Sequence, residues 1–387
     1  MLVTHLTLTD FRNYETAEVE FAPGANLFVG SNGQGKTNLV ESLGYLSTLG
    51  SHRVATDHAM IRKGCDSAIV RARVQHGDRQ VLAEVQLNRT SANRAQINRS
   101  AIRTRDLPRY FSSVLFAPED LALVRGEPSG RRRFLDELLV LLTPRLSGVM
   151  ADYDRVLKQR NSLLKSARSS GVKGAQLSTL EIWDDRLVAL GSELIEARSR
   201  LIALLVPQVS AAYVAIAGED HRAQLSSQLS ILSSDVDDEN SPASTGGEFV
   251  PIFAADAAVA FRASLVRLRR AELERAVTLV GPHRDDLILE LNGMAARGYA
   301  SHGESWSFAL SLKLASAEVL RRESTSGDPV LILDDVFAEL DQSRRARLAG
   351  AVAGFEQVLI TAAVLEDVPE ELTANTVRIQ QGRIVDE

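Results

Sequence analysis

Residues 30–37 read Gly30, Ser31, Asn32, Gly33, Gln34, Gly35, Lys36 and Thr37, which is the complete pattern G-x-x-x-x-G-K-T. Glycines let a backbone adopt conformations closed to other residues, so successive N–H groups of such a loop can point inward at a phosphate. The stretch follows an apolar, strand-like run at 26–29 and precedes a helical pattern. It therefore predicts a phosphate-binding loop, with a ligand-free glycine turn as the alternative.

The last two residues of this phosphate loop carry polar side chains with expected roles. Lys36 is expected to bind the β- and γ-phosphates of ATP and to be a catalytic residue. Thr37 is expected to hold a magnesium ion. The helix that begins near Lys36 adds the positive end of its dipole to the same cavity. ATP and Mg2+ are therefore the expected cofactors.

A second polar site follows an apolar run near the other end of the chain. Residues 330–333 are all apolar, and Asp334 and Asp335 come directly after them. A strand buried on both faces has this composition, and its C-terminal end opens at the edge where ligands bind. Asp334 would hold the magnesium ion, and Asp335 would orient or deprotonate the attacking water. Alone, the pattern could be a simple strand-end turn; together with the phosphate loop it has the form of a Walker B motif.

The composition indicates a globular, cytoplasmic protein. With 387 residues, 45% of them hydrophobic, the chain is long enough for two or three structural units. No apolar run is expected to approach the roughly 18 to 20 residues of a membrane span, and residues 1–10 lack the pattern of a signal peptide. The single cysteine, Cys65, fits a reducing cytosol.

Positive charge is concentrated locally, although the formal net charge is −6. Three arginine-rich segments lie at 89–109, 131–133 and 262–275. Each segment alone could be a solvated face, but three of them on an acidic chain favour a confined surface for a phosphate backbone. The residues expected to contact DNA are Arg94, Arg99, Arg103, Arg105, Arg131 and Arg132.

The first 120 residues show mostly strand-like patterns. Short alternating stretches at 6–8 and 19–21 precede the phosphate loop. Residues 68–74 and 81–87 alternate on either side of His76-Gly77-Asp78, which predicts a β-hairpin.

The middle of the chain is predicted to be helical. Apolar residues recur at helical spacing from about 131 to 205, with Pro144 at a helix start or kink and 166–177 as the loop of a helical hairpin. The polar stretch 226–247 is predicted to be a flexible loop. A helix, a strand and a second helix are then expected at 261–276, 287–291 and about 304–322, respectively.

Two segments beside the paired carboxylates resemble motifs of ABC ATPases. The run 301–305, Ser-His-Gly-Glu-Ser, opens a predicted helix and resembles the signature motif. Ser301, Gly303 and the helix N–H groups could meet a γ-phosphate held by a second subunit; a plain N-cap is the alternative. Asp341 lies where these ATPases carry their D-loop aspartate.

Together these segments are similar to the SMC-like branch of ABC ATPases, and finer motifs resemble the RecF family of bacterial recombination mediators. The resemblance covers nearly the whole chain except about 140–260. Its motifs are Phe11-Arg12-Asn13-Tyr14, Ser51-His52-Arg53, residues 116–121 (FAPEDL), residues 131–136 (RRRFLD), residues 281–287 (GPHRDDL) with Asn292-Gly293, and residues 333–337 (LDDVF).

The resemblance implies an α/β fold: an ABC-type P-loop ATPase head with an antiparallel β-subdomain and an inserted helical arm domain. About 300 residues separate the phosphate loop from the Walker B carboxylates, so the head would be built from both ends of the chain. We expect 1–125 to form the first head lobe, 126–275 the arm, and 276–387 the completion of the head.

The resemblance also implies a function in recombinational repair and replication restart. Such a protein would be an ATP-dependent homodimer that clamps double-stranded DNA beside single-stranded gaps and helps load RecA, with RecO and RecR as partners, on the nucleoid. Arg12 would lie near the adenosine or the phosphates. Thr361 stands where many ABC proteins have a switch histidine, which implies a weak ATPase.

The sequence departs from the family pattern in two ways and leaves other interpretations open. The signature reads Ser-His-Gly-Glu where the family usually has Ser-Gln-Gly-Gln, and the sequence shows no convincing Q-loop glutamine. Glu304 stands where the family usually has glutamine, which places a negative charge beside the expected γ-phosphate. A metal or acid-base cluster at 283–286 is conceivable, although a role in fixing a loop is favoured. Two rival functions are a DNA-processing ATPase of another SMC-like type and a scaffold that uses ATP without significant turnover.

Overall fold

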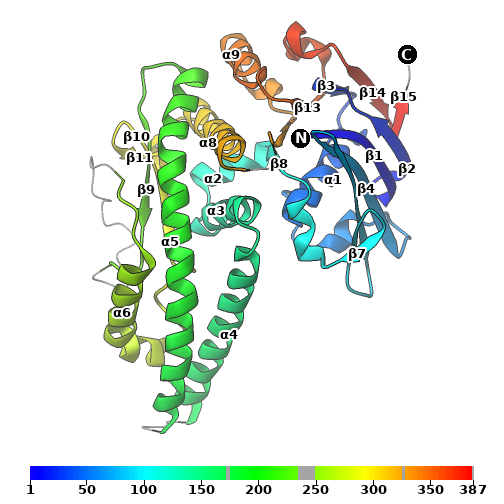
Figure 1. Cartoon of the computed structure of the whole chain (residues 1–387). Coiled ribbons are helices and arrows are strands. Elements are labelled where there is room, and N and C mark those ends of the chain that lie inside the picture. Colours follow the sequence, from blue (N-terminus) through cyan, green and yellow to red (C-terminus); the bar gives the residue numbers. More distant parts are fainter. Residues whose placement is uncertain (171–174, 234–248, 325–326, 386–387) are drawn as a thin grey trace. The chain divides into compact units, whose positions relative to one another are not determined.

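The computed structural model describes residues 1–170, 175–233, 249–324 and 327–385, which divide into two compact units (Figure 1). We call them the head unit, made of Met1–Val124, Gln208–Arg222 and Ser301–Glu387, and the arm unit, made of Arg125–Pro207 and Ala223–Ala300. The division expected from the sequence stays a prediction. The structure groups 208–222, which were expected in the arm, with the head, and it groups 276–300 with the arm. The reason is local, because a strand at 286–291 pairs with one at 223–228.

The head unit contains an antiparallel sheet that begins at the N-terminus. Its strands lie in the order β2-β1-β4-β5-β6-β7, with bounds β1 Leu2–Phe11, β2 Tyr14–Glu20, β4 Ser67–His76, β5 Arg79–Asn88, β6 Arg94–Ile97 and β7 Ser100–Ile102. The pairing of Val74 with Val81 and of Ala68 with Leu87 confirms the predicted hairpin. Alternate residues of β1, including Leu6 and Leu8, are buried, as expected of a sheet with one solvated face.

A second sheet of the head unit is mostly parallel and buried. Its order is β15-β14-β3-β13-β12-β8, with bounds β3 Gly24–Val29, β8 Ser113–Phe116, β12 Val330–Asp334, β13 Gln357–Ala362, β14 Thr376–Gln380 and β15 Arg383–Val385. Every residue of β12 and β13 is buried, which explains the continuous apolar runs 330–333 and 358–360 within them. Because β3, β12 and β13 run parallel, the phosphate loop and Asp334 leave the sheet at the same edge.

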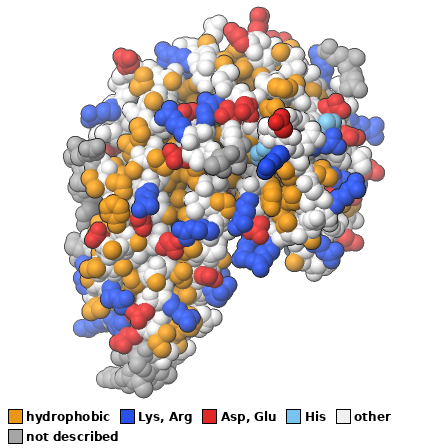
Figure 2. Space-filling model, viewed as in Figure 1, with side chains coloured by type: hydrophobic (Ala, Val, Ile, Leu, Met, Phe, Trp, Pro, Cys, Tyr) orange, Lys and Arg blue, Asp and Glu red, His pale blue; other side chains and the backbone are white. Residues whose placement is uncertain are grey.

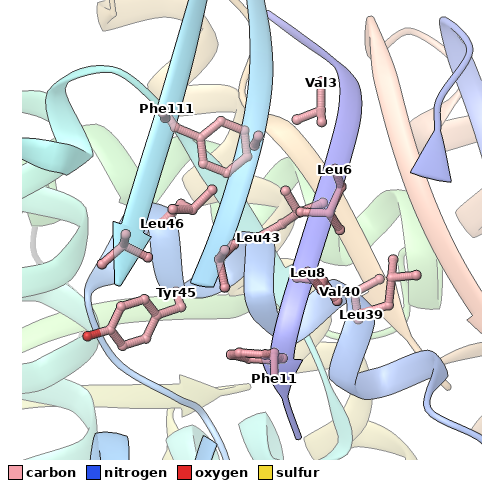
Figure 3. Packing of buried hydrophobic residues seen from close by; sticks show 14 of the residues in the cluster. Val3, Leu6, Leu8, Phe11, Leu39, Val40, Leu43, Tyr45, Leu46 and Phe111 are labelled. Atoms are coloured by element: carbon pink, nitrogen blue, oxygen red, sulfur yellow. The ribbon is translucent and has the colours of Figure 1, made fainter. Parts of the chain in front are cut away.

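Helix α1, Lys36–Thr48, packs its apolar residues against the first sheet. Figure 3 shows Leu39, Leu43 and Leu46 of α1 among Leu6, Leu8 and Phe111 in one buried cluster. The head unit also holds α2 Leu121–Arg125, α8 His302–Glu323, α9 Gln342–Val352 and the 3-10 turns η1 Asp57–Met60, η2 Thr104–Arg109, η3 Pro118–Asp120, η4 Phe337–Glu339, η5 Leu365–Asp367 and η6 Glu370–Leu372. In α8, Trp306 stacks edge-on against Phe116 of β8, which fixes this helix on the second sheet.

The arm unit consists of long helices and a small sheet. Its elements are α3 Pro128–Leu142, α4 Leu146–Ser170, α5 Ala175–Ala217 (whose end lies in the head unit), β9 Ala223–Gln228, α6 Ala254–Arg275, β10 Asp286–Leu291, β11 Met294–Ala295 and α7 Ala296–Tyr299. The fully buried Arg160 of α4 joins this unit, because it binds Asp184 of α5 at 2.7 Å and Glu272 of α6 at 2.6 Å. Side chains of both charge signs are interspersed over the face of the molecule in Figure 2.

Two loops predicted in this region are wrong in part. In the loop predicted at 166–177, residues 166–170 belong to α4 and 175–177 belong to α5, and 171–174 lie outside the described residues. The flexible loop predicted at 226–247 is wrong at its start, where Ser226–Gln228 belong to β9 and pair with β10. The remainder from 234 lies outside the described residues.

One helical stretch corrects the expectation about membrane spans. Residues Thr179–Ala217 of α5 are long and apolar enough to cross a membrane by length and composition alone. Within this stretch Leu201, Leu205, Val209 and Tyr213 recur at intervals of four and are buried. A one-sided buried stripe is typical of a helix packed on a protein core, so the stretch is weak evidence for a span.

Candidate nucleotide site

The phosphate loop joins β3 to α1, and its glycines are required by the backbone. A Cβ on Gly30 would lie 2.3 Å from the carbonyl oxygen of Ile379, and Gly33 and Gly35 have φ of +82° and +120°. Lys36 is 3% exposed, and its Nζ lies 3.5 Å from the carbonyl oxygen of Ser31. Among the described residues, no side chain makes a capping hydrogen bond at the N-terminus of α1, so its first N–H groups can bind a phosphate.

Neighbouring segments hold this loop from both sides. Tyr14 donates its hydroxyl to the carbonyl oxygen of Gly35 at 3.0 Å, and Asn13 donates to that of Gln34 at 3.1 Å. The N–H groups of Gln381 and Gly382, between β14 and β15, donate to Gln34 as well. Burial raises the pKa of Tyr14, so its hydroxyl stays protonated and continues to donate. The loop is thus shaped before any ligand binds.

Asp334 and Thr37 meet at the end of β12, as the sequence predicted for a magnesium site. Thr37 Oγ1 donates to Asp334 Oδ1 at 3.0 Å, and Thr361 Oγ1 of β13 donates to the same oxygen at 2.6 Å. Burial raises the pKa of Asp334 to about 6, against the lowering effect of the Thr361 hydrogen bond. A hydroxyl and a carboxylate oxygen side by side are the ligand types that Mg2+ prefers, so these residues fit the ion.

Asp335 follows in a strained conformation. Its φ is +51°, a value that residues other than glycine rarely adopt, and its N–H donates to Thr361 Oγ1 at 2.9 Å. Thr361 therefore fixes both carboxylate residues, one through its hydroxyl hydrogen and the other through its oxygen. The sequence placed Thr361 at a switch position and did not predict this bridging role.

The sequence also did not assign a role to His52, which lies beside the same carboxylate. Its Nε2 is 3.9 Å from Asp334 Oδ2 and has no hydrogen-bond partner among the described residues. Burial lowers the pKa of His52, against the raising effect of Glu119, Glu41 and Asp120. Residues 51–53 and 116–121 are both motifs of the family resemblance. The sequence could not show that His52 of the first motif lies near Glu119 and Asp120 of the second.

Arg12 lies beside α1, but its guanidinium is already engaged. It donates two hydrogen bonds to Glu41 of α1, at 2.8 and 2.6 Å, and one to the carbonyl oxygen of Ala59 at 2.9 Å. Burial opposes ionisation of Glu41, yet the Arg12 hydrogen bonds keep its pKa below the usual value. The contact of Arg12 with a nucleotide stays a prediction.

The predicted signature segment forms the start of α8. Ser301 and Glu304 make a reciprocal capping box: Ser301 N–H donates to Glu304 at 2.7 Å, and Glu304 N–H donates to Ser301 Oγ at 3.3 Å. These hydrogen bonds lower the pKa of Glu304. A Cβ on Gly303 would lie 2.9 Å from Arg344 of α9. Among the described residues, no hydrogen bond or ion pair joins Ser301 or Gly303 to the phosphate loop of the same chain.

The predicted DNA-contacting arginines fall into two groups. Arg94, Arg99, Arg103 and Arg105 of the head unit, here called the arginine cluster, are exposed and make no ion pair within the part of the chain that the structure describes. Arg131 of the arm is 4% exposed and donates to Asp286 at 2.8 and 2.7 Å. It is therefore not available to a DNA phosphate, which corrects the prediction for this residue.

The reason for the burial of Arg131 is the periodicity of α3. Its Leu135 and Leu138 are buried, and Arg131 lies four and seven positions before them on the same helical face. Arg132 is half-buried and donates to the carbonyl oxygen of Asp285 at 2.7 Å, so its role at DNA stays a prediction. Arg133 is exposed and pairs with Glu137.

The charged residues at 283–286 fix a turn of the arm, which agrees with the favoured interpretation that they hold a loop in place. His283 Nδ1 lies 2.8 Å from the hydroxyl of Tyr153, and burial lowers the pKa of His283 to about 4, so the ring is neutral. Asp285 accepts two hydrogen bonds from Ser230 at 2.8 Å, through its N–H and its hydroxyl. These contacts join α4, the segment after β9 and the turn before β10.

The comparisons with known proteins agree with this geometry. A family model described as the RecF/RecN/SMC N-terminal domain matches residues 2–383. An SMC head from Pyrococcus furiosus, bound to the C-terminal domain of ScpA, shares the fold at 14% identity and a TM-score of 0.52, covering 99% of this chain and 95% of the other. Fold and site therefore define an SMC-like ABC-type ATPase.

More similar relatives narrow this class. The DNA replication and repair protein RecF of Leifsonia xyli is 66% identical over the full length of both chains, and that of Clavibacter sepedonicus is 64% identical over all of this chain and 95% of the relative. The solved structure of the recombination mediator RecF with ATP is 28% identical with a TM-score of 0.85, covering 99% of this chain and 96% of that chain. The chain belongs to the RecF family.

Proposed function

We propose that the chain is an ATP-dependent DNA clamp in recombinational repair and replication restart. One observation carries the proposal: Thr37 of the phosphate loop donates to Asp334 of β12, although 297 positions separate the two residues. The two halves of an ATPase site thus lie together beside the buried Lys36. Because the chain belongs to the RecF family, we place this activity in DNA repair.

The chemical step would be hydrolysis of ATP. Lys36 and the N–H groups of α1 would bind the phosphates, and Thr37 and Asp334 would hold Mg2+, which neutralises phosphate charge when bound. Asp335 would take a proton from a water molecule as its oxygen attacks the γ-phosphorus and the bond to the bridging oxygen of ADP breaks. We infer a slow turnover, because Thr361 offers no imidazole at the switch position.

ATP would also join two copies of the chain. Ser301 is exposed at the start of the 22-residue helix α8, where free N–H groups and the helix dipole favour a phosphate. We infer that Ser301 and Gly303 of one copy contact the γ-phosphate bound at Lys36 of the other. Hydrolysis would remove that shared phosphate and release the dimer.

The arginine cluster is the proposed DNA contact of the head unit. Arg94, Arg99, Arg103 and Arg105 are exposed, and guanidinium groups without an acidic partner can bind backbone phosphates with little sequence preference. Double-stranded DNA next to a single-stranded gap is the proposed substrate. RecO, RecR and RecA are the proposed partners and the cytoplasmic nucleoid the proposed location, in keeping with the RecFOR pathway named for the solved relative.

Substitution of Asp335 tests the ATPase mechanism. Asp335→Asn should lower phosphate release from ATP about 100-fold or more while leaving ATP binding intact, because it removes the proton acceptor alone. Glu339→Gln, an exposed acid four residues away, serves as the control. Unchanged hydrolysis in Asp335→Asn would refute the assigned role. A wild-type protein that binds ATP without measurable turnover would favour the scaffold, and cleavage or unwinding of DNA would favour the other SMC-like type.

A further inference from the structure

The arginine cluster is anchored by a residue to which the proposed function assigns no role. Arg94 begins β6, Arg99 lies in the β6–β7 turn, and Arg103 and Arg105 flank Thr104 at the start of η2. These segments are short and lie at the β7 edge of the first sheet. Their positions depend on what holds the segment before β6 and the segment before η2.

Asn93 holds both segments. Thr104 Oγ1, between two cluster arginines, donates to the carbonyl oxygen of Asn93 at 3.2 Å, and Arg94 is the next residue along the chain. The side chain of Asn93 accepts from Asn88 N–H at 3.0 Å and donates to Asp57 Oδ2 at 2.6 Å. A hydrogen bond to a carboxylate is stronger than one between neutral groups.

The same carboxylate binds the helix that starts at the phosphate loop. Tyr45 of α1 donates its hydroxyl to Asp57 Oδ2 at 2.9 Å, and Asn93 Nδ2 lies 3.4 Å from that hydroxyl. Tyr45 is 1% exposed, and Figure 3 shows its hydroxyl directed away from Leu43 and Leu46. Burial raises the pKa of Tyr45, so the hydroxyl remains a donor.

Helix α1 connects the two ends of this arrangement. It runs from Lys36 at the phosphate loop to Thr48, a length of roughly 20 Å, and Tyr45 lies in its last turn. The helix also packs directly against η2. Because a packed helix moves as a rigid body, a shift of its first turn on nucleotide binding reaches Tyr45 with little loss.

We propose that the hydrogen bonds of Tyr45, Asp57 and Asn93 couple the phosphate loop to the arginine cluster, so that the bound nucleotide sets the affinity of the cluster for a phosphate backbone. This rests on the proposed ATP-dependent DNA binding and names the residues that transmit it. Asn93 would act as a positioning residue, because it places the arginines according to the position of α1.

The test compares DNA affinity in two nucleotide states. Anisotropy of a labelled gapped duplex is titrated with full-length protein in ATP and in ADP, and the ratio of the two Kd values measures the coupling. Tyr45→Phe removes one hydroxyl and keeps the ring, Asn93→Ala removes the amide, and the double variant completes a cycle. Tyr110→Phe, a tyrosine of the same unit outside the contacts of Asn93, is the control.

Each single variant should lower the ATP-to-ADP ratio about fivefold or more, with DNA affinity in ADP and binding of a fluorescent ATP analogue within about twofold of wild type. The double variant should lower the ratio no further than either single variant does. If both single variants keep the wild-type ratio, the coupling through these residues is refuted, whereas the proposed function stands. Equal weakening in both nucleotides also refutes the coupling, because Asn93 would then only shape the cluster. A wild-type protein with equal affinities in ATP and ADP would instead refute the proposed function itself.

Discussion

Arginines that are neighbours in the sequence take different positions on helix α3. Arg131 is 4% exposed and fully engaged with Asp286, whereas Arg133, two positions later, has a side chain that is 56% exposed and pairs with Glu137 along the helix. The three arginines 131–133 are consecutive in the sequence, yet Arg131 is buried and Arg133 is exposed. What separates them is the face of α3 on which each lies.

Arg131→Ala should destabilise the arm unit by about 3 to 5 kcal/mol, because Asp286 would lose its partner in a nearly buried position. Arg133→Ala should change stability by at most about 0.5 kcal/mol, since it breaks an exposed pair only. Urea unfolding followed by Trp183 fluorescence, in a Trp306→Phe background, reports the arm unit. An Arg131→Ala protein of normal stability with weakened DNA binding would restore the original prediction that Arg131 contacts DNA.

Asp285 should make the stability of the arm depend on pH. Burial raises its pKa from 3.8 to about 6, although Ser230 hydrogen bonds oppose the shift. A raised pKa means that folding favours the protonated form, so the contribution of this group is complete below pH 4 and is lost as the pH rises toward 6.

Asp285→Asn should therefore stabilise the arm by about 3 kcal/mol at pH 7.5 and leave it unchanged near pH 4. Asparagine keeps an oxygen for Ser230 and replaces Oδ2, which has no hydrogen-bond partner among the described residues. The same urea assay at the two pH values measures this difference. A loss of stability at pH 7.5 would show that the ionised carboxylate is favoured in the folded arm.

At the scale of elements, the segments with strong local signals were predictable. The phosphate loop between β3 and α1, the β4–β5 hairpin, α8 and β12 all have sequence patterns of their own, and the structure confirms these elements. Strands β8, β13 and β14 were not predicted, because their place depends on pairing with strands far away in the sequence. The contact of Thr361 illustrates this: Thr361 is the last but one residue of β13, and its hydroxyl reaches Asp334 only because β12 and β13 pair.

The start of α8 carries a charge that weakens its proposed contact with a phosphate. Glu304 completes the capping box with Ser301 and also lies 3.4 Å from His221. Glutamine can make the same capping box without the charge. Glu304→Gln should therefore strengthen ATP-dependent dimerisation up to about fivefold. Glu323→Gln at the other end of the helix is the control, and weaker dimerisation of Glu304→Gln would contradict the proposed position of the γ-phosphate.

At the scale of the whole molecule, the head unit alone contains every residue proposed to bind nucleotide. The phosphate loop and the Walker B carboxylates meet within one chain, whereas the start of α8 makes no hydrogen bond or ion pair with the phosphate loop in the described structure. If the start of α8 contacts the γ-phosphate, as we propose, a second copy of the chain has to supply it. We therefore expect ATP to join two copies of the chain.

Sedimentation velocity in ATP and in ADP, with wild-type protein and Ser301→Arg, tests this claim most directly. We expect a dimer of the 42.1 kDa chain in ATP, a monomer in ADP, and a monomer in both for Ser301→Arg, because this substitution places a bulky side chain at the proposed position of the γ-phosphate. Retention of ATP binding by the variant would show that its own phosphate loop is intact. A wild-type protein of the same mass in both nucleotides, or an ATP dimer unaffected by Ser301→Arg, would contradict the account.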